Sequence, residues 1–286
     1  MFDTTIILIS YKSEKLILNF IKKLPKLIPI IIIDNSNSFL LEDVIKKEYS
    51  NLEVFVKNND GVSSALNYAV EKIKTKYFLQ ISPDIDFDYK DIWVYLDFAK
   101  KLNNKFAAIG PRFLDIKKKS HKQISESVDY DSIDSIHGSC MFINKECFNK
   151  IGRFDENYFL YFEETDYCYR GKKIGYKSYQ INQSKVETLG RSVKFENKDE
   201  EKKVSKVLIW HFIWSKFYYY KKRYGKIISI ILFIPIIFRT ILKIYLNKLI
   251  NNQEDMEKYK TRMDGIITSI KGKKSSLRPE HHKPHV

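Results

Sequence analysis

Short apolar runs alternate with helix-like segments over the first part of the chain, and this alternation restricts the fold more than any other feature. Four runs typical of strands buried on both faces lie at residues 5–9, 29–34, 52–56 and 77–81. The segments between them are predicted to be helices, at residues 13–23, 39–48 and 62–73. Strands that alternate with helices predict βαβ units, and therefore an α/β fold with a mostly parallel central sheet.

The middle of the chain is less regular. Helices are predicted at residues 89–101 and 145–151, strands at residues 107–113 and 139–143, and a basic loop at residues 117–122. Ser13 stands where the N-cap of the first helix is expected.

Acidic and amide side chains follow the predicted strands. Asp34 ends the second strand, Asn59 follows the third, and Asp84 and Asp86 follow the fourth. Ligands of such sheets bind at the carboxyl ends of the strands, so we expect these side chains to face one crevice.

The composition bounds the class of protein. The 286 residues, 44% of them hydrophobic, are enough for one large domain or for one domain with an appendage. The cysteines Cys140, Cys147 and Cys168 lack paired metal-ligand spacing, and the N-terminus has no secretory pattern. An odd number of cysteines without a signal favours a reducing compartment, and we therefore expect a cytoplasmic protein.

Two acidic clusters are candidates for chemistry. Asp84 and Asp86 are spaced to hold Mg²⁺ or Mn²⁺, although acid pairs are also common in solvated turns. Residues 158–166 place three acids directly after a dense aromatic stretch. Aromatic faces suit sugars, and apolar walls raise the pKa of a carboxylic acid toward that of a useful base. The alternative is the acidic first turn of an ordinary helix.

The order of these motifs resembles the family 2 glycosyltransferases, especially the bacterial rhamnosyltransferase-like branch. The resemblance covers roughly residues 4–192, and its motifs follow one another in the family's order. These motifs are Ile9-Ser10-Tyr11, Asp34, Asn59-x-Gly61 with Asn67, Pro83-Asp84, Gly138-x-x-Met141-x-Ile143, Gly152-x-Phe154-Asp155-Glu156, the acid cluster, Arg170 and Gly175-Tyr176.

The resemblance implies a GT-A fold and an inverting sugar transfer from a nucleotide-diphosphate donor. It assigns Glu164 as the base, with Asp166 as the alternative. The nucleotide site would comprise Ser10, Tyr11, Asp34, Asn59, Gly61 and Asp84. Beside these, we expect His137, Tyr158, Tyr161 and Glu163 to line the acceptor site, with a structural role as the alternative for His137. The implied donor is deoxythymidine-diphosphate rhamnose, with a uridine-diphosphate hexose next. The implied acceptor is a saccharide or polyprenyl-linked glycan in polysaccharide synthesis.

The sequence departs from the family pattern at two positions. Glu163-Glu164 stands where the family usually has Glu-Asp, and Glu187 stands where it often has a His near the metal or diphosphate. A Glu binds a metal but repels a bare phosphate. The expected metal ligands are Asp84, Asp86 and Glu187.

The C-terminal part of the chain is strongly basic. From residue 202 onward, 19 Lys and Arg face 5 Asp and Glu, so this part carries +14 of the formal +15. An aromatic run at residues 207–220 is followed by basic residues and by an apolar run at residues 227–238, which spans about 18 Å as a helix. This pattern favours a helix lying on an anionic membrane over one that spans it, because spanning would bury Arg239 and Lys243. The alternative is a soluble helical subdomain.

We therefore expect a catalytic domain at residues 1–200, a membrane-associating helical region at 201–270 and a disordered tail at 271–286. The protein would act on the inner face of the cell membrane, without nucleic acid as a partner. The competing functions are a nucleotidyltransferase, although residues 10–13 are not its Gly-rich phosphate loop, and a non-enzymatic membrane or nucleic-acid binding module.

Overall fold

The computed structural model describes residues 3–36, 41, 45, 49, 51–115, 122–190 and 198–278. Most of the helix predicted at residues 39–48 and most of the predicted basic loop lie outside these residues. The chain forms two compact units. We call Met1–Glu156 with Glu163–Lys194 the sheet unit, and Asn157–Phe162 with Phe195–Val286 the helical unit.

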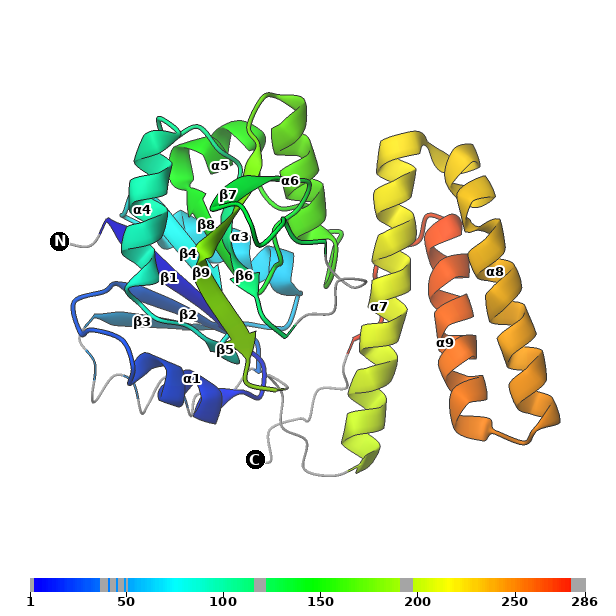
Figure 1. Cartoon of the computed structure of the whole chain (residues 1–286). Helices are drawn as coiled ribbons and strands as arrows, with labels where there is room; N and C mark the ends of the chain where they lie inside the picture. The colour runs from blue at the N-terminus through cyan, green and yellow to red at the C-terminus, as the bar shows by residue number, and fades with distance from the viewer. Residues whose placement is uncertain are drawn as a thin grey trace. The chain divides into compact units, whose positions relative to one another are not determined.

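The sheet unit is built on a mixed sheet in the order β3-β2-β1-β4-β8-β6-β9-β5, with β7 paired to β9 (Figure 1). Its strands are β1 Thr4–Ser10, β2 Ile30–Asp34, β3 Leu52–Val56, β4 Tyr77–Ile81, β5 Ile85–Asp86, β6 Ile109–Phe113, β7 Tyr130–Ile133, β8 Cys140–Asn144 and β9 Ser178–Thr188. The pairs β3-β2, β2-β1 and β1-β4 are parallel. The chain leaves β1 toward β2 and β3 and then returns to its other side at β4, so the sheet has a switch point at the carboxyl end of β1.

Helices cover both faces of this sheet, which explains the continuous apolar runs. They are α1 Glu14–Ile21, α3 Val62–Lys72, α4 Asp91–Lys101, α5 Lys145–Ile151 and α6 Glu163–Lys173. Ile6 and Leu8 of β1 pack in one core cluster with α1 and α4, and Ile7 packs in the other with α3, α5 and α6. Ser13 occupies the N-cap position of α1, but its hydroxyl contacts Ser10 and Tyr11 instead of capping the helix.

The helical unit contains α7 Lys198–Tyr224, α8 Lys226–Leu249 and α9 Gln253–Ile270. Its small core is formed by Ile213 and Phe217 of α7, Phe233 of α8 and Ile266 of α9. Gly265 lets α9 approach α7 closely, because a Cβ there would come within 2.9 Å of the Trp210 carbonyl oxygen.

Helix α8 extends beyond the apolar run seen in the sequence. Its 24 residues correspond to about 36 Å at 1.5 Å per residue. Its most apolar 18-residue window has a mean hydropathy of 2.3, and only 17% of that window is buried. By length and composition alone, α8 is able to cross a membrane.

The segment that follows α9 contacts helix α7 through its first residues. Residues 275–278, which the sequence predicts to be disordered, instead contact the buried His211 of α7. The Ser275 hydroxyl lies 2.8 Å from His211 Nδ1, and the Leu277 carbonyl oxygen lies 2.6 Å from Nε2. Residues 279–286 lie outside the described part of the chain.

Arg170 fixes helix α6 to the end of α5. Its guanidinium donates to Asp166 at 2.8 Å and to the carbonyl oxygens of Ile151, Gly152 and Arg153 at 2.8, 3.0 and 2.8 Å. The last carbonyls of a helix lack partners within the helix, so these bonds terminate α5 and orient α6 together.

We expect Asp166→Asn to lower the free energy of unfolding by about 1–3 kcal/mol, because it removes the charge that pairs with Arg170 in a buried site. Urea unfolding measures this change. Glu146→Gln removes an exposed i,i+4 pair with Lys150 and is the matched control, which should leave stability nearly unchanged. Equal stability of both variants would contradict the role given to Asp166.

Candidate functional site

The carboxyl ends of β1 and β2 bring Ser10 and Asp34 side by side, since the two are register partners. Asp34 is fully buried, and its Oδ1 accepts from the Ser36 amide at 2.9 Å. Its Oδ2 has no hydrogen-bond partner. Burial raises the pKa of Asp34 above its usual value. A buried acceptor without a donor is costly, so this oxygen suits an N–H or O–H group of a ligand.

Asn59 and Gly61 form the turn into α3 beside this position. The Asn59 side chain accepts from the Gly61 amide at 3.3 Å, and Gly61 has φ +99°, a conformation that favours glycine. The Lys57 amide donates to the Asp34 carbonyl oxygen at 2.8 Å, which ties this segment to the end of β2. Asn67 has a structural role that the sequence does not reveal: its amide bonds both the N–H and the C=O of Phe154.

The predicted metal ligands lie at the short β5–β9 ladder. Asp86 is the register partner of Glu187, and the Asp84 carbonyl oxygen accepts from the Leu189 amide at 2.7 Å. Burial raises the pKa of Asp84, whereas the exposed Asp86 pairs with Lys23 at 2.9 Å.

These three acids do not form the expected ligand cluster. Within the described residues, no group of three or more His, Cys, Asp or Glu side chains is arranged to hold a metal. The half-buried Asp84 fits a cation that takes most of its ligands from a bound phosphate group and water, as Mg²⁺ commonly does.

Two adjacent carboxyl groups begin α6. Glu163 is 7% exposed, and its Oε2 has no hydrogen-bond partner. Burial, together with the neighbouring charge of Glu164, raises the pKa of Glu163 well above its usual value. Glu164 is half-buried and accepts from the Thr165 hydroxyl at 2.9 Å. The backbone of Gly138 lies against the pair, since a Cβ there would be 3.6 Å from Glu164 Cγ.

A protonated Glu163 beside Glu164 removes repulsion between two negative charges. Environments that separate the pKa values of two neighbouring acids are typical of acid–base sites. Asp166, the alternative base, is 2% exposed and bonded to Arg170, so the structure gives it a structural contact.

The predicted acceptor residues occupy different surroundings. The His137 ring packs on Phe113 at 4.7 Å, and its Nδ1 accepts from the Ser139 amide. Tyr158, which the sequence assigns to the acceptor site, is fully buried and packs on Tyr218 of α7. Its ring is therefore buried by contacts within the helical unit. Tyr161 is half-buried.

Tyr161 and Phe162, directly before Glu163, have left-handed backbones with φ of +69° and +70°. Such conformations are strained for aromatic residues and persist only when neighbouring contacts hold them. Within the helical unit, Ser215 of α7 donates to the Leu160 carbonyl oxygen at 2.9 Å, and Phe212 packs against both rings. The sequence shows α7 as an aromatic run, but not that this run supports the segment.

Comparisons with known proteins agree with this architecture. Two curated relatives are similar in sequence: the low-salt glycan biosynthesis hexosyltransferase Agl10 of Haloferax volcanii, 26% identical over 60% of this chain, and the rhamnosyltransferase WbbL of Escherichia coli, 24% identical over 64%. The chain spans 62% of the length of Agl10 and 78% of that of WbbL.

A solved structure of GalNAc-T7 with UDP, GalNAc and Mn²⁺ superposes with a TM-score of 0.53 and 15% identity. The superposition covers 77% of this chain and 50% of that one, and it confirms the predicted GT-A fold. The family model for glycosyl transferase family 2 matches residues 5–173, more than half of the chain. This chain therefore belongs to glycosyl transferase family 2.

Proposed function

We propose that the protein is an inverting glycosyltransferase that moves a sugar from a nucleotide-diphosphate donor to a saccharide or lipid-linked glycan. The observation that carries the proposal is a pair of unlike carboxyl groups at the start of α6, with Glu163 buried and Glu164 half-buried. It is supported by the buried Asp34, whose unpartnered oxygen lies at the carboxyl edge of the same sheet unit.

Asp34 and Asp84 would receive the donor. The unpartnered Asp34 oxygen accepts a hydrogen bond from the nucleoside. Ser10 is the register partner of Asp34 and Tyr11 follows it, while the Asn59–Gly61 turn follows Lys57, whose amide donates to the Asp34 carbonyl oxygen. Asp84 would hold Mg²⁺ or Mn²⁺, which neutralises charge on a diphosphate leaving group when bound. Similarity to the rhamnosyltransferase WbbL supports rhamnose as the transferred sugar, for which the family resemblance implies a deoxythymidine-diphosphate carrier. The GalNAc-T7 structure with UDP supports a uridine-diphosphate sugar as the second candidate.

Glu164 would act as the base of a single displacement. It takes the proton of the acceptor hydroxyl while that oxygen bonds to the anomeric carbon, and the bond from this carbon to the diphosphate oxygen breaks. One displacement inverts the anomeric configuration. A neutral Glu163 leaves Glu164 as the proton acceptor of the pair.

The helical unit would hold the enzyme on an anionic membrane at the cytoplasmic face, where lipid-linked glycans for polysaccharide synthesis are extended. Support comes from the exposed apolar side chains of α8, among them Ile231 and Phe238, and from the +14 charge after residue 201.

The proposed base is tested by Glu164→Gln. We expect the transfer rate to fall by about 10² or more, since the amide cannot take a proton, with donor affinity unchanged. The measurement is nucleoside diphosphate release from a panel of sugar nucleotides with Mn²⁺ or Mg²⁺, after thermal shift identifies those that bind. Asp166→Asn, folded and active, is the control. If no sugar nucleotide binds or is consumed by the wild type, the proposed function is wrong.

The state of Glu163 is tested by pH. Its pKa is raised in the folded protein, so its contribution to stability is present at low pH and is lost as pH rises through the folded value. Glu163→Gln keeps the neutral form. The variant should therefore gain stability relative to wild type as the pH rises above the usual pKa range of a glutamate, by up to about 1.4 kcal/mol per pH unit. Melting temperatures across this rise in pH measure the effect, with the exposed Glu187→Gln as control. If the difference in melting temperature between Glu163→Gln and wild type does not change with pH, Glu163 is not protonated in the folded protein.

The membrane surface is tested by flotation of the full chain with liposomes containing anionic lipid. Ile231→Lys and Phe238→Lys change side chains that are 57% and 67% exposed on α8, so we expect folded variants that no longer float. Leu27→Lys alters an exposed apolar residue of the sheet unit and should float like the wild type. If the α8 variants float as the wild type does, this part of the proposal is wrong.

A further inference from the structure

The sheet unit has an open cleft of about 780 Å³ between α4, residues 126–130 and β9. We call it the β9 cleft. None of the residues that line it belongs to the predicted nucleotide, acceptor, metal or catalytic sets. Its volume lies within the range of ligand sites, about 300–1,000 Å³.

A bulge in β9 shapes the floor of the cleft. Pro111 of β6 pairs with Ile181, but the next residue, Arg112, pairs with Lys185, so residues 182–184 have no partners on β6. Bulges re-aim side chains and are common next to functional sites. Ser184 turns inward and bonds Tyr95 at 2.7 Å and Asp91 at 2.6 Å, while Asn182 and Gln183 line the cleft.

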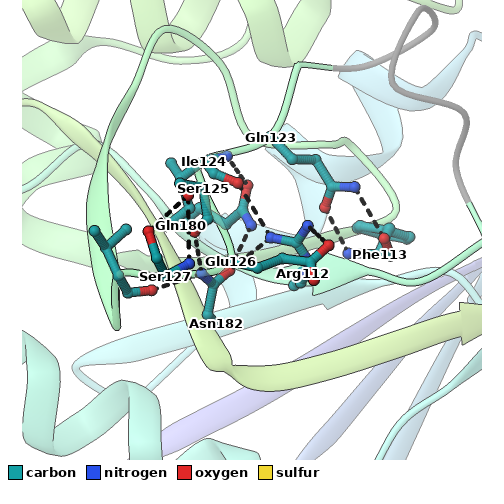
Figure 2. Close-up of polar contacts among 10 residues, drawn as sticks. Arg112, Phe113, Gln123, Ile124, Ser125, Glu126, Ser127, Gln180 and Asn182 are labelled. Atoms are coloured by element: carbon teal, nitrogen blue, oxygen red, sulfur yellow. Dashed lines mark hydrogen bonds and ion pairs between the residues drawn. The ribbon is translucent and has the colours of Figure 1, made fainter.

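The wall beside the bulge is held by a polar network (Figure 2). The buried Arg112 donates to Glu126 at 2.7 Å, to Asn182 at 3.2 Å and to the Ile124 carbonyl oxygen at 3.1 Å. Asn182 in turn donates to the carbonyl oxygens of Ser125 and Val128 at 2.7 and 2.6 Å. A network bonded in this way is rigid, so a ligand would bind without ordering the wall.

The lining has the chemistry of a site for hydroxyl groups. Trp93 and Tyr130 line the cleft and are each 50% exposed, which leaves aromatic surface for the C–H faces of sugar rings. The charged lining residues balance as three carboxylates and three cations: Asp97, Glu126, Asp129, Lys101, Arg112 and Lys185. A balanced set of donors and acceptors suits a neutral polyol, whose hydroxyls both donate and accept, better than a phosphate or an anionic polymer.

We propose that the β9 cleft binds a neutral oligosaccharide, at a site separate from the one where sugar transfer is proposed. Binding there needs neither donor nor metal, so it is measured independently of the proposed function.

The test is an array of neutral and anionic bacterial oligosaccharides, followed by titration of the hits. Tryptophan fluorescence reports on the cleft, because Trp93 is exposed whereas Trp210 and Trp214 are 3% and 2% exposed. We expect a neutral oligosaccharide to bind the wild type. Trp93→Ala should weaken binding by at least about fivefold. Gln183→Ala, an independent change to an exposed polar side chain of the cleft, should weaken it by a similar factor. Tyr245→Ala removes an exposed aromatic ring of α8 and is the matched control, with binding unchanged.

Glu164→Gln separates the two sites. Saccharide binding that survives this substitution and is lost on Trp93→Ala supports the cleft, even in a protein that transfers no sugar. If binding is lost in Glu164→Gln but is unchanged in Trp93→Ala and Gln183→Ala, the saccharide binds at the acceptor site and the proposal is overturned. An array on which no neutral saccharide binds, or only anionic ones bind, overturns it as well.

Discussion

The contact of Arg170 with Asp166 and with three backbone carbonyls holds the acidic helix α6 against the end of α5. Because the guanidinium binds the end of α5, α6 has one position relative to that helix. The Glu163–Glu164 pair opens α6, so the same contact fixes the pair. Asn67 acts in parallel by bonding the loop between α5 and α6 at Phe154. The site therefore depends on polar contacts made by residues that are not themselves reactive.

The sheet unit keeps two carboxyl groups buried at a cost to stability. Asp34 and Glu163 each have a buried oxygen without a hydrogen-bond partner, and burial raises the pKa of both. Either group would be stabilised by a donor from a bound ligand. The apolar clusters on both faces of the sheet offset such a cost. Departures from ordinary burial rules are expected of functional sites.

The sequence predicts the elements whose side chains follow one clear pattern. Strand β4 and helix α5 begin and end at their predicted bounds. Strand β9 was not predicted, because its exposed and buried residues are both often polar. The pairing of Asp86 with Glu187 joins residues 101 positions apart, which no local pattern reveals. The burial of Tyr158 was not predicted, because an aromatic residue beside acids has the same sequence pattern whether it faces a sugar or a core.

The six residues directly before Glu163 belong to the helical unit by their contacts. Their left-handed members Tyr161 and Phe162 are held by packing on Phe212 of α7, and such backbone conformations cost about 1–3 kcal/mol each when unsupported. Loss of the α7 contacts would therefore free the chain just before the acid pair. Helix α7 therefore has two structural roles. It packs against α9, which also packs on α8, and it supports the segment that leads into Glu163. A truncation before α7 removes both the packing of the three helices and the support of the segment before Glu163. A substitution on the exposed surface of α8 leaves that support in place.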